Sequence, residues 1–324
     1  MPTILHRLQT LFYIVYYYFH LGWLYYNRWI FDPRPNLKDP HSHTIVILGD
    51  DNALGFGDWT MIGNPAGLAY KLPELIHKEP NIRQRWYVLN RGAWRKTSEE
   101  WLPESESLLF VYLLALDAAP LNKQNIFSLQ KQTPKPTLLR TTLAPLKVRS
   151  ADIFILIVGA EDVRTKIITP QQTLYNIRAI CDHILKHSTA ARPPTVYVTS
   201  VPTAGDDLLL DEVQRKKNEE RNRLIKEWLK NPPANVCAGP IIDLSNFEYD
   251  RNDIYSKDRR HFNSHVCISG YYRVAKDFLL VMKSDMVKRE FGVFKTQLGL
   301  DYASDDEDKV AEAGATGETA EVKA

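Results

Sequence analysis

The sequence predicts an α/β fold of three layers, in which a mostly parallel sheet lies between helices and an aromatic helix precedes the domain. Two patterns lead to this prediction. Short apolar runs alternate along the chain with stretches of helical periodicity, and blocks rich in Gly, Asp and Asn follow directly after the apolar runs. The 324 residues, 44% of them hydrophobic, suffice for one large core with appendages.

Five apolar runs, bounded by Gly, Pro or Asn, predict the strands. A strand covered by helices on both faces has no polar face, so its sequence is apolar throughout instead of alternating. The runs are Thr44–Leu48, Trp86–Leu89, Asp152–Val158, Thr195–Thr199 and a fifth within Val236–Leu244.

Helices are predicted between and after these runs. Gln171–Lys186 is apolar at helical spacing, Leu208–Leu229 carries a weaker apolar stripe, and Ile268–Met282 closes the domain. Residues 104–143 do not fit the alternation, because an apolar start is followed by a Pro-, Gln- and Thr-rich stretch. We interpret them as an insertion with one helix and a loop, which covers the active-site edge, contacts a partner or belongs to the core.

The N-terminal segment, residues 1–32, is expected to be a membrane anchor or an interfacial helix. Residues 11–26 carry no formal charge and are rich in Tyr, with Arg7 before them and Arg28 after them. This run is slightly short for a spanning helix, and its Tyr and Trp content suits a membrane–water interface. A cleaved signal peptide and a helix packed on the protein's own core or on a partner remain alternatives.

The rest of the chain divides into a linker at 33–43, one domain at 44–300 and an acidic tail at 301–324. The tail has almost no large apolar residues, which predicts disorder. The net charge of +2 and the lack of a basic cluster among aromatic residues argue against a nucleic-acid partner. Three widely spaced cysteines form no disulfide framework, and no cofactor or contiguous metal-binding motif is present.

Four polar blocks stand at the ends of predicted strands or before the last helix. They are Gly49–Gly55, Asn90–Gly92, Gly159–Asp162 and Asp258–Ser264. Because parallel strands end at the same edge of a sheet, and ligands bind at that edge, the blocks are expected to meet at one site.

This ordered set resembles the SGNH/GDSL hydrolase superfamily of esterases and lipases. The resemblance implies a serine that attacks an acyl carbon, a D-x-x-H pair that activates it, and an oxyanion hole made by glycine and asparagine donors. Position by position, Asp258 and His261 match the D-x-x-H pair and Gly92 matches the oxyanion glycine. His265 is a rival for His261, because its spacing to the Gly270 block fits the family pattern better.

The match breaks at two positions. Asp51 stands where the family has its serine, and Glu161 stands where the family has its asparagine. A carboxylate has no proton for a histidine to remove, and Glu161 places an acceptor where a developing oxyanion needs a donor. We therefore expect no ordinary serine esterase activity.

Four interpretations follow for this altered pocket. The main one is a scaffold or accessory subunit at a membrane, mitochondrial or endomembrane, with a membrane or membrane-protein complex as its partner and no known small-molecule substrate. One alternative is a hydrolase in which Asp51 attacks and His261, with Asp258, activates water. Another is a metal site made of Asp51, Glu161 and His261. In the fourth interpretation the pocket has no function: Asp50, Asp51 and Asp162 only cap helices or turns, and Asp258 forms an ion pair with His261.

Overall fold

The computed structural model describes residues 4–56, 58, 67–103, 137–202, 212–242, 266 and 268–300. The predicted acidic tail, most of the predicted insertion, and the three residues Asp258, His261 and His265 lie outside these ranges.

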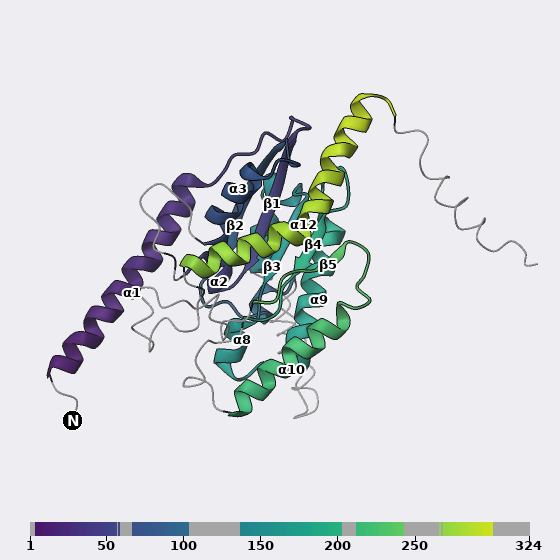
Figure 1. Cartoon of the computed structure of the whole chain (residues 1–324). Coiled ribbons are helices and arrows are strands. Elements are labelled where there is room, and N and C mark those ends of the chain that lie inside the picture. The colour runs from purple at the N-terminus through teal and green to yellow at the C-terminus, as the bar shows by residue number, and fades with distance from the viewer. Residues whose placement is uncertain are drawn as a thin grey trace, which may run out of the picture.

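The five predicted runs form one parallel sheet in the order β2-β1-β3-β4-β5 (Figure 1). This confirms the predicted α/β fold. The strands are β1 (Ser42–Gly49), β2 (Arg85–Gly92), β3 (Ile153–Ile157), β4 (Thr195–Val198) and β5 (Val236–Ala238).

Helices cover both faces of the sheet, because successive strand side chains point to opposite sides. In β1, Ile45 and Ile47 join one hydrophobic core, whereas Val46 and Leu48 join the other. The first core is closed by α3 (Leu68–Lys78) and α12 (Ile268–Gln297). The second is closed by α6 (Leu138–Leu143), α7 (Leu146–Arg149), α9 (Pro170–His187) and α10 (Glu212–Trp228).

Two helices differ from the prediction. Helix α3 was not predicted: Pro73 inside it disfavours a helix, although Leu68, Leu72 and Ile76 are apolar at helical spacing and buried. Helix α12 continues well beyond Met282. Its extension is useful to the fold because Glu290 accepts hydrogen bonds from the Nε1 of Trp86, at 2.9 Å, and from two backbone N–H groups just before β2.

The N-terminal helix α1 (Ile4–Phe31) lies against the domain with its C-terminal half. Leu21 and Leu24 pack on Phe56, and just after the helix Asp32 forms a bidentate ion pair with Arg91 in β2, at 2.8 and 2.9 Å. Figure 1 shows the other half of α1 extending away from the sheet. In the described part of the chain, no helix has both the length and the apolarity needed to cross a membrane.

Candidate functional site

The site lies where the order of the sheet reverses. Strand β1 pairs with β2 on one side and with β3 on the other, so the loops after β1 and β3 diverge at the carboxyl edge of the sheet. A hydrogen bond of 3.0 Å from the N–H of Ala160 to Oδ2 of Asp50 joins these two loops. The first and third polar blocks therefore meet, as the sequence predicted.

Two glycines allow neighbouring segments of backbone to lie close together at this edge of the sheet. Gly49 has a φ of +145°, and a Cβ there would lie 1.8 Å from the carbonyl oxygen of Ile157. A Cβ on Gly92 would lie 2.2 Å from the backbone nitrogen of Leu54 in α2 (Asp51–Leu54). Both positions thus require the absence of a side chain.

Asp50 is a buried structural acid. It caps α2 by accepting the N–H of Asn52 at 3.0 Å, so one of the expected capping roles is present. Burial, and secondly the adjacent Asp51, raise the pKa of Asp50 to about 7.

The two acids that replace the serine and the asparagine of the resembled family share one cation. Nη1 of Arg164 lies 2.8 Å from Oδ2 of Asp51 and 2.6 Å from Oε2 of Glu161. The other oxygen of Asp51 accepts the backbone N–H of Arg95 at 2.5 Å. Asp51 is 1% exposed, so its carboxylate is enclosed as well as paired.

Opposing influences act on this ion-pair group. Burial alone would lower the pKa of Arg164, but the carboxylates of Asp51 and Glu161 outweigh burial and raise it. The pKa of Glu161 is also raised, chiefly by burial and further by Asp51, although Arg164 opposes the shift. The guanidinium is therefore firmly charged and partly neutralises two acids that would otherwise repel each other.

The backbone donor at this position comes from Arg95. The resemblance assigned that role to Gly92, but the N–H of Gly92 donates to Oδ1 of Asn90 at 2.9 Å. Arg95 has a φ of +52°, a left-handed conformation that favours glycine, and it points its N–H at Asp51. Sequence reasoning missed Arg95 and Arg164; only the three-residue spacing of Arg164 from Glu161 hinted at an interaction.

Asp162, the last residue of the third block, anchors the loop after β2. It accepts hydrogen bonds from the N–H and Oγ of Ser98, at 2.7 and 2.6 Å, and from Oγ1 of Thr173 at 2.7 Å. Burial raises the pKa of Asp162 although these hydrogen bonds oppose the shift. Its function is to join the loop to α8 (Ala160–Thr165) and α9.

Helix α1 forms one side of the region around Asp51. The Nε1 of Trp94 donates to the hydroxyl of Tyr17 at 2.7 Å, and the ring of Tyr17 lies 4.8 Å from that of Phe56. Arg28 donates to the carbonyl oxygen of Gly92 at 2.7 Å. The aromatic helix is thus attached to the loops that carry the site.

In the part of the chain that the structure describes, no three His, Cys, Asp or Glu side chains lie together in a way that could hold a metal ion. Asp51 and Glu161 do meet, as the metal hypothesis required, but Arg164 lies with them. The third ligand of that hypothesis, His261, is outside the described ranges.

Among solved structures, the fold is similar to that of esterases and lipases. An aryl esterase of M. smegmatis, bound to an inhibitor, matches at 13% identity over 75% of this chain and 99% of its own, with a TM-score of 0.45. A carbohydrate acetylesterase from Sinorhizobium meliloti matches at 11% identity over 75% and 98%, with a TM-score of 0.42. A lipase from a goat rumen metagenome matches at 11% over 72% and 95%, with a TM-score of 0.43.

A likeness this distant concerns the fold alone and says nothing of what this chain acts on. No family model matches the chain, and no curated protein matches it significantly.

Proposed function

We propose that this chain uses an SGNH-hydrolase-type fold without serine esterase activity and acts as a scaffold or accessory subunit at a membrane surface. The observation that carries the proposal is the position of Arg164. Its guanidinium lies between the acids at the nucleophile and oxyanion positions, at 2.8 Å from Asp51 and 2.6 Å from Glu161.

This arrangement opposes acyl transfer in two ways. Both oxygens of Asp51 accept hydrogen bonds, one from Arg164 and one from the N–H of Arg95. Such bonds stabilise the negative charge of the carboxylate and so make it a weaker nucleophile. At the position that the resemblance assigns to an oxyanion donor, Glu161 offers only acceptor oxygens, and the nearby guanidinium of Arg164 is already bound to it.

One observation favours the alternative of a hydrolase with Asp51 as nucleophile. Burial raises the pKa of Glu161, as a proton donor to a leaving group would require. Against this, the 2.6 Å hydrogen bond from Arg164 stabilises the ionised form of Glu161. The same guanidinium would repel a metal ion held by Asp51 and Glu161, which weakens the metal alternative.

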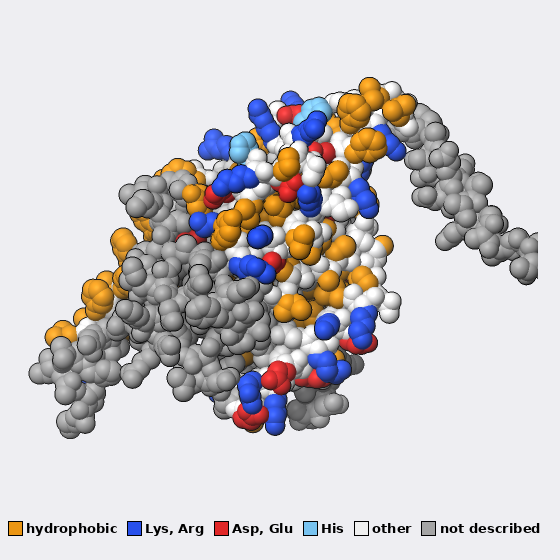
Figure 2. All heavy atoms as spheres, viewed as in Figure 1, with side chains coloured by type: hydrophobic (Ala, Val, Ile, Leu, Met, Phe, Trp, Pro, Cys, Tyr) orange, Lys and Arg blue, Asp and Glu red, His pale blue; other side chains and the backbone are white. Residues whose placement is uncertain are grey.

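The membrane part of the proposal is supported by the outer surface of α1. This helix has no acidic residue, and apolar side chains remain exposed along it, including Trp29 at 78% and Phe12 at 66% (Figure 2). Tyr and Trp side chains suit the membrane–water interface. A helix lying flat in that interface would keep its inner side on Phe56 and Trp94 while its outer side contacts lipid.

Hydrolysis of p-nitrophenyl acetate by the full chain tests the enzymatic part. We expect no turnover above the buffer rate for the native chain and none for Asp51→Ser, because Glu161 and Arg164 remain in place. Native turnover that Asp51→Ala abolishes would overturn the proposal.

The nucleophile alternative has its own test. Alkyl halides and epoxides should be incubated with the full chain in ¹⁸O-labelled water, and the peptide that contains Asp51 analysed by mass spectrometry. Label in the Asp51 carboxylate, absent when Asp51→Asn is treated in the same way, would establish an ester intermediate and exclude a purely structural role.

A further inference from the structure

A buried histidine at the amino edge of the sheet connects β1 with two other parts of the fold. His43, near the start of β1, is 4% exposed and stacks on the ring of Trp86 in β2, with the centroids 4.5 Å apart. Its Nδ1 lies 3.3 Å from Oδ2 of Asp152, just before β3. Its Nε2 lies 2.7 Å from Oε1 of Gln84, just before β2. The imidazole is therefore held at both of its nitrogens.

Both partners of this histidine also contact the end of α12. Nε2 of Gln84 donates to the backbone carbonyl of Glu290 at 3.2 Å, and the N–H of Gln84 donates to Oε1 of Glu290 at 3.0 Å. On the other side, Nη1 of Arg289 lies 3.7 Å from Oδ1 of Asp152. Figure 1 shows the terminal turns of α12 at this edge of the sheet. The environment of His43 is thus linked to the position of α12.

The hydrogen-bond pattern requires a protonated imidazole. The carbonyl oxygen of Glu290 can only accept, so the amide of Gln84 is oriented with Oε1 towards His43. The ionised carboxylate of Asp152 also can only accept. A neutral imidazole has one N–H and faces one of these two acceptors with a lone pair, whereas an imidazolium donates to both.

The charges around His43 favour the same form. The charged side chains near it belong to Asp152, Glu290 and Arg289. Burial alone would lower the pKa of His43, but the hydrogen bonds to Asp152 and Gln84, together with the two carboxylates, outweigh burial and raise it. The opposing cation, Arg289, is itself drawn towards Asp152. The imidazolium therefore persists to a higher pH than in an ordinary histidine.

We propose that His43 is a pH-sensitive latch, which holds the terminal turns of α12, residues 287–297, against the amino edge of the sheet when its imidazole is protonated and loosens them when it is neutral. The latch lies at the opposite edge of the sheet from Asp51. It is independent of the proposed function and of any hydrolysis.

Loss of one proton weakens the attachment of α12 in a direct way. One of the two acceptors, Asp152 or Gln84, then lies against a lone pair and loses its donor. Gln84 carries a contact to Glu290, and Asp152 carries one to Arg289. Because the folded pKa is raised, the stabilisation is fully present below the ordinary value of 6.5 and is lost as the pH rises through the folded value.

A second histidine near the end of α12 acts in the opposite direction. Nε2 of His41 lies 2.9 Å from Nε2 of Gln297, an amide nitrogen that can only donate. This contact therefore requires a neutral His41, and a rise in pH can only strengthen it. Loosening of α12 at higher pH would thus not come from His41.

Hydrogen–deuterium exchange of the full chain, followed by mass spectrometry at about pH 5.5 and about pH 8.5, tests the proposal. After correction for the intrinsic effect of pH on exchange, residues 287–297 should exchange at least about fivefold faster at the higher pH relative to α9, since one hydrogen bond to a charged group is lost. Helix α9 is the internal reference because it covers the other face of the sheet. Asp50, with its pKa of about 7, affects the stability of the whole domain and so acts on both segments.

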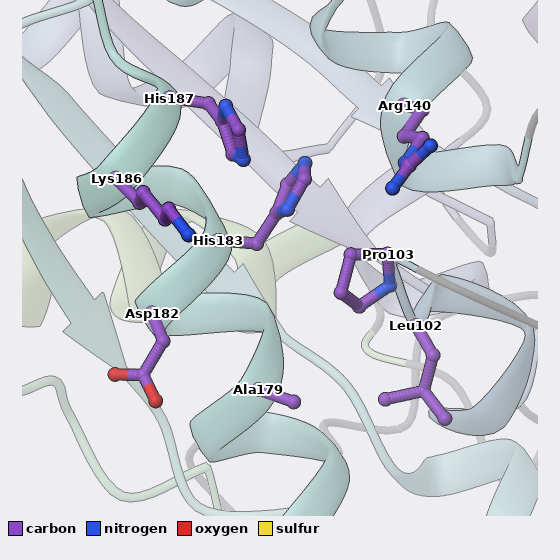
Figure 3. A pocket seen from close by; sticks show the side chains of 8 residues that line it. All are labelled: Leu102, Pro103, Arg140, Ala179, Asp182, His183, Lys186 and His187. Atoms are coloured by element: carbon purple, nitrogen blue, oxygen red, sulfur yellow. The ribbon is translucent and has the colours of Figure 1, made fainter. Parts of the chain in front are cut away.

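His43→Gln removes the titrating group and should abolish this pH dependence. His187→Gln is the matched control, because His187 is exposed on α9, and Figure 3 shows it in a surface pocket beside His183. It should leave the pH dependence unchanged. Equal exchange of the native chain at the two pH values, slower exchange at the higher pH, persistence of the effect in His43→Gln or its loss in His187→Gln would each overturn the proposal.

A second measurement uses only the native chain and does not depend on how well His43→Gln folds. Titration of the His43 ring by NMR should give a pKa above the ordinary 6.5, and the exchange of residues 287–297 should change over the same pH interval. A pKa below 6.5, or two midpoints that differ by more than about one pH unit, would also contradict the latch.

Discussion

Nη1 of Arg164 lies 2.8 Å from Oδ2 of Asp51, although 113 residues separate them in the chain. Asp51 begins α2, directly after β1, and Arg164 belongs to α8, which follows β3. Their ion pair therefore joins the two loops that border the reversal of the sheet. The position that the sequence resemblance assigns to the nucleophile is thus a point of attachment between two parts of the fold.

Removing this cation should destabilise the protein. Arg164→Ala leaves Asp51 and Glu161 close together without their shared partner, and we expect a loss of about 2–4 kcal/mol in the free energy of unfolding. The value lies towards the lower side of the range for buried pairs because the Arg164 side chain is 27% exposed. Urea unfolding followed by circular dichroism measures it.

Arg215→Ala provides the comparison for that experiment. Arg215 pairs with Glu212 on the exposed surface of α10, with side chains 46% and 54% exposed. Such pairs contribute less than about 1 kcal/mol. Equal losses in the two variants would mean that the Arg164 group is no more than a surface ion pair.

Asp50 should make stability depend on pH. Its folded pKa of about 7 lies above the ordinary value of 3.8, so the fold favours the protonated acid. The resulting stability is fully present below about pH 4 and is lost as the pH rises through about 7. We expect Asp50 to contribute a decrease of up to about 4 kcal/mol over that interval.

The measurement compares urea unfolding of the native chain and Asp50→Asn between pH 4.5 and pH 8. The variant starts less stable, because an amide offers one acceptor where Asp50 accepts N–H groups from Asn52 and Ala160. Its stability should nevertheless change less with pH. Parallel curves for the two proteins would contradict the assignment.

A side chain at Gly92 should also be costly. The Cβ of Gly92→Ala would lie 2.2 Å from the backbone nitrogen of Leu54, so the loop after β1 or the end of β2 must move. We expect a loss of about 3 kcal/mol or more, measured by thermal unfolding. Gly22→Ala in α1 meets nothing within 4 Å and should instead be stabilising by up to about 1 kcal/mol.

The outer face of α1 should bind lipid. Vesicles of phosphatidylcholine and phosphatidylserine should sediment the full chain, and the double variant Phe19→Ser, Trp29→Ser should reduce binding at least about tenfold, since both side chains are well exposed, at 64% and 78%. Leu280→Ser, on α12 with 77% exposure, is the control. Equal reduction in the control, or no binding by the native chain, would remove the support for a membrane role.

The strands could be predicted from the sequence because burial on both faces leaves a simple apolar signature. All five runs became strands, and the fifth, within Val236–Leu244, is the short edge strand β5. The full length of α12 could not be predicted, because Glu290 is a charged residue whose partners, such as Trp86, are distant in sequence. Only the folded chain brings these hydrogen-bond donors to Glu290.

The candidate site was predicted in part. Asp51 and Glu161 follow β1 and β3, so parallel pairing places them at one edge, and the structure brings them together. Arg164 could not be identified, because an acid and a base three residues apart usually form a surface pair on a helix. Arg95 could not be identified either, since its left-handed backbone conformation leaves no mark in the sequence.

The guanidinium of Arg164, which two acids share, limits which amino-acid substitutions the chain can tolerate during evolution. Replacing Asp51 alone, or Glu161 alone, leaves Arg164 with one carboxylate partner fewer in an enclosed site. Replacing Arg164 first leaves two acids in mutual repulsion. We therefore expect the loss of Arg164 to be the least tolerated of these changes, so that this arginine is kept for as long as both acids are present.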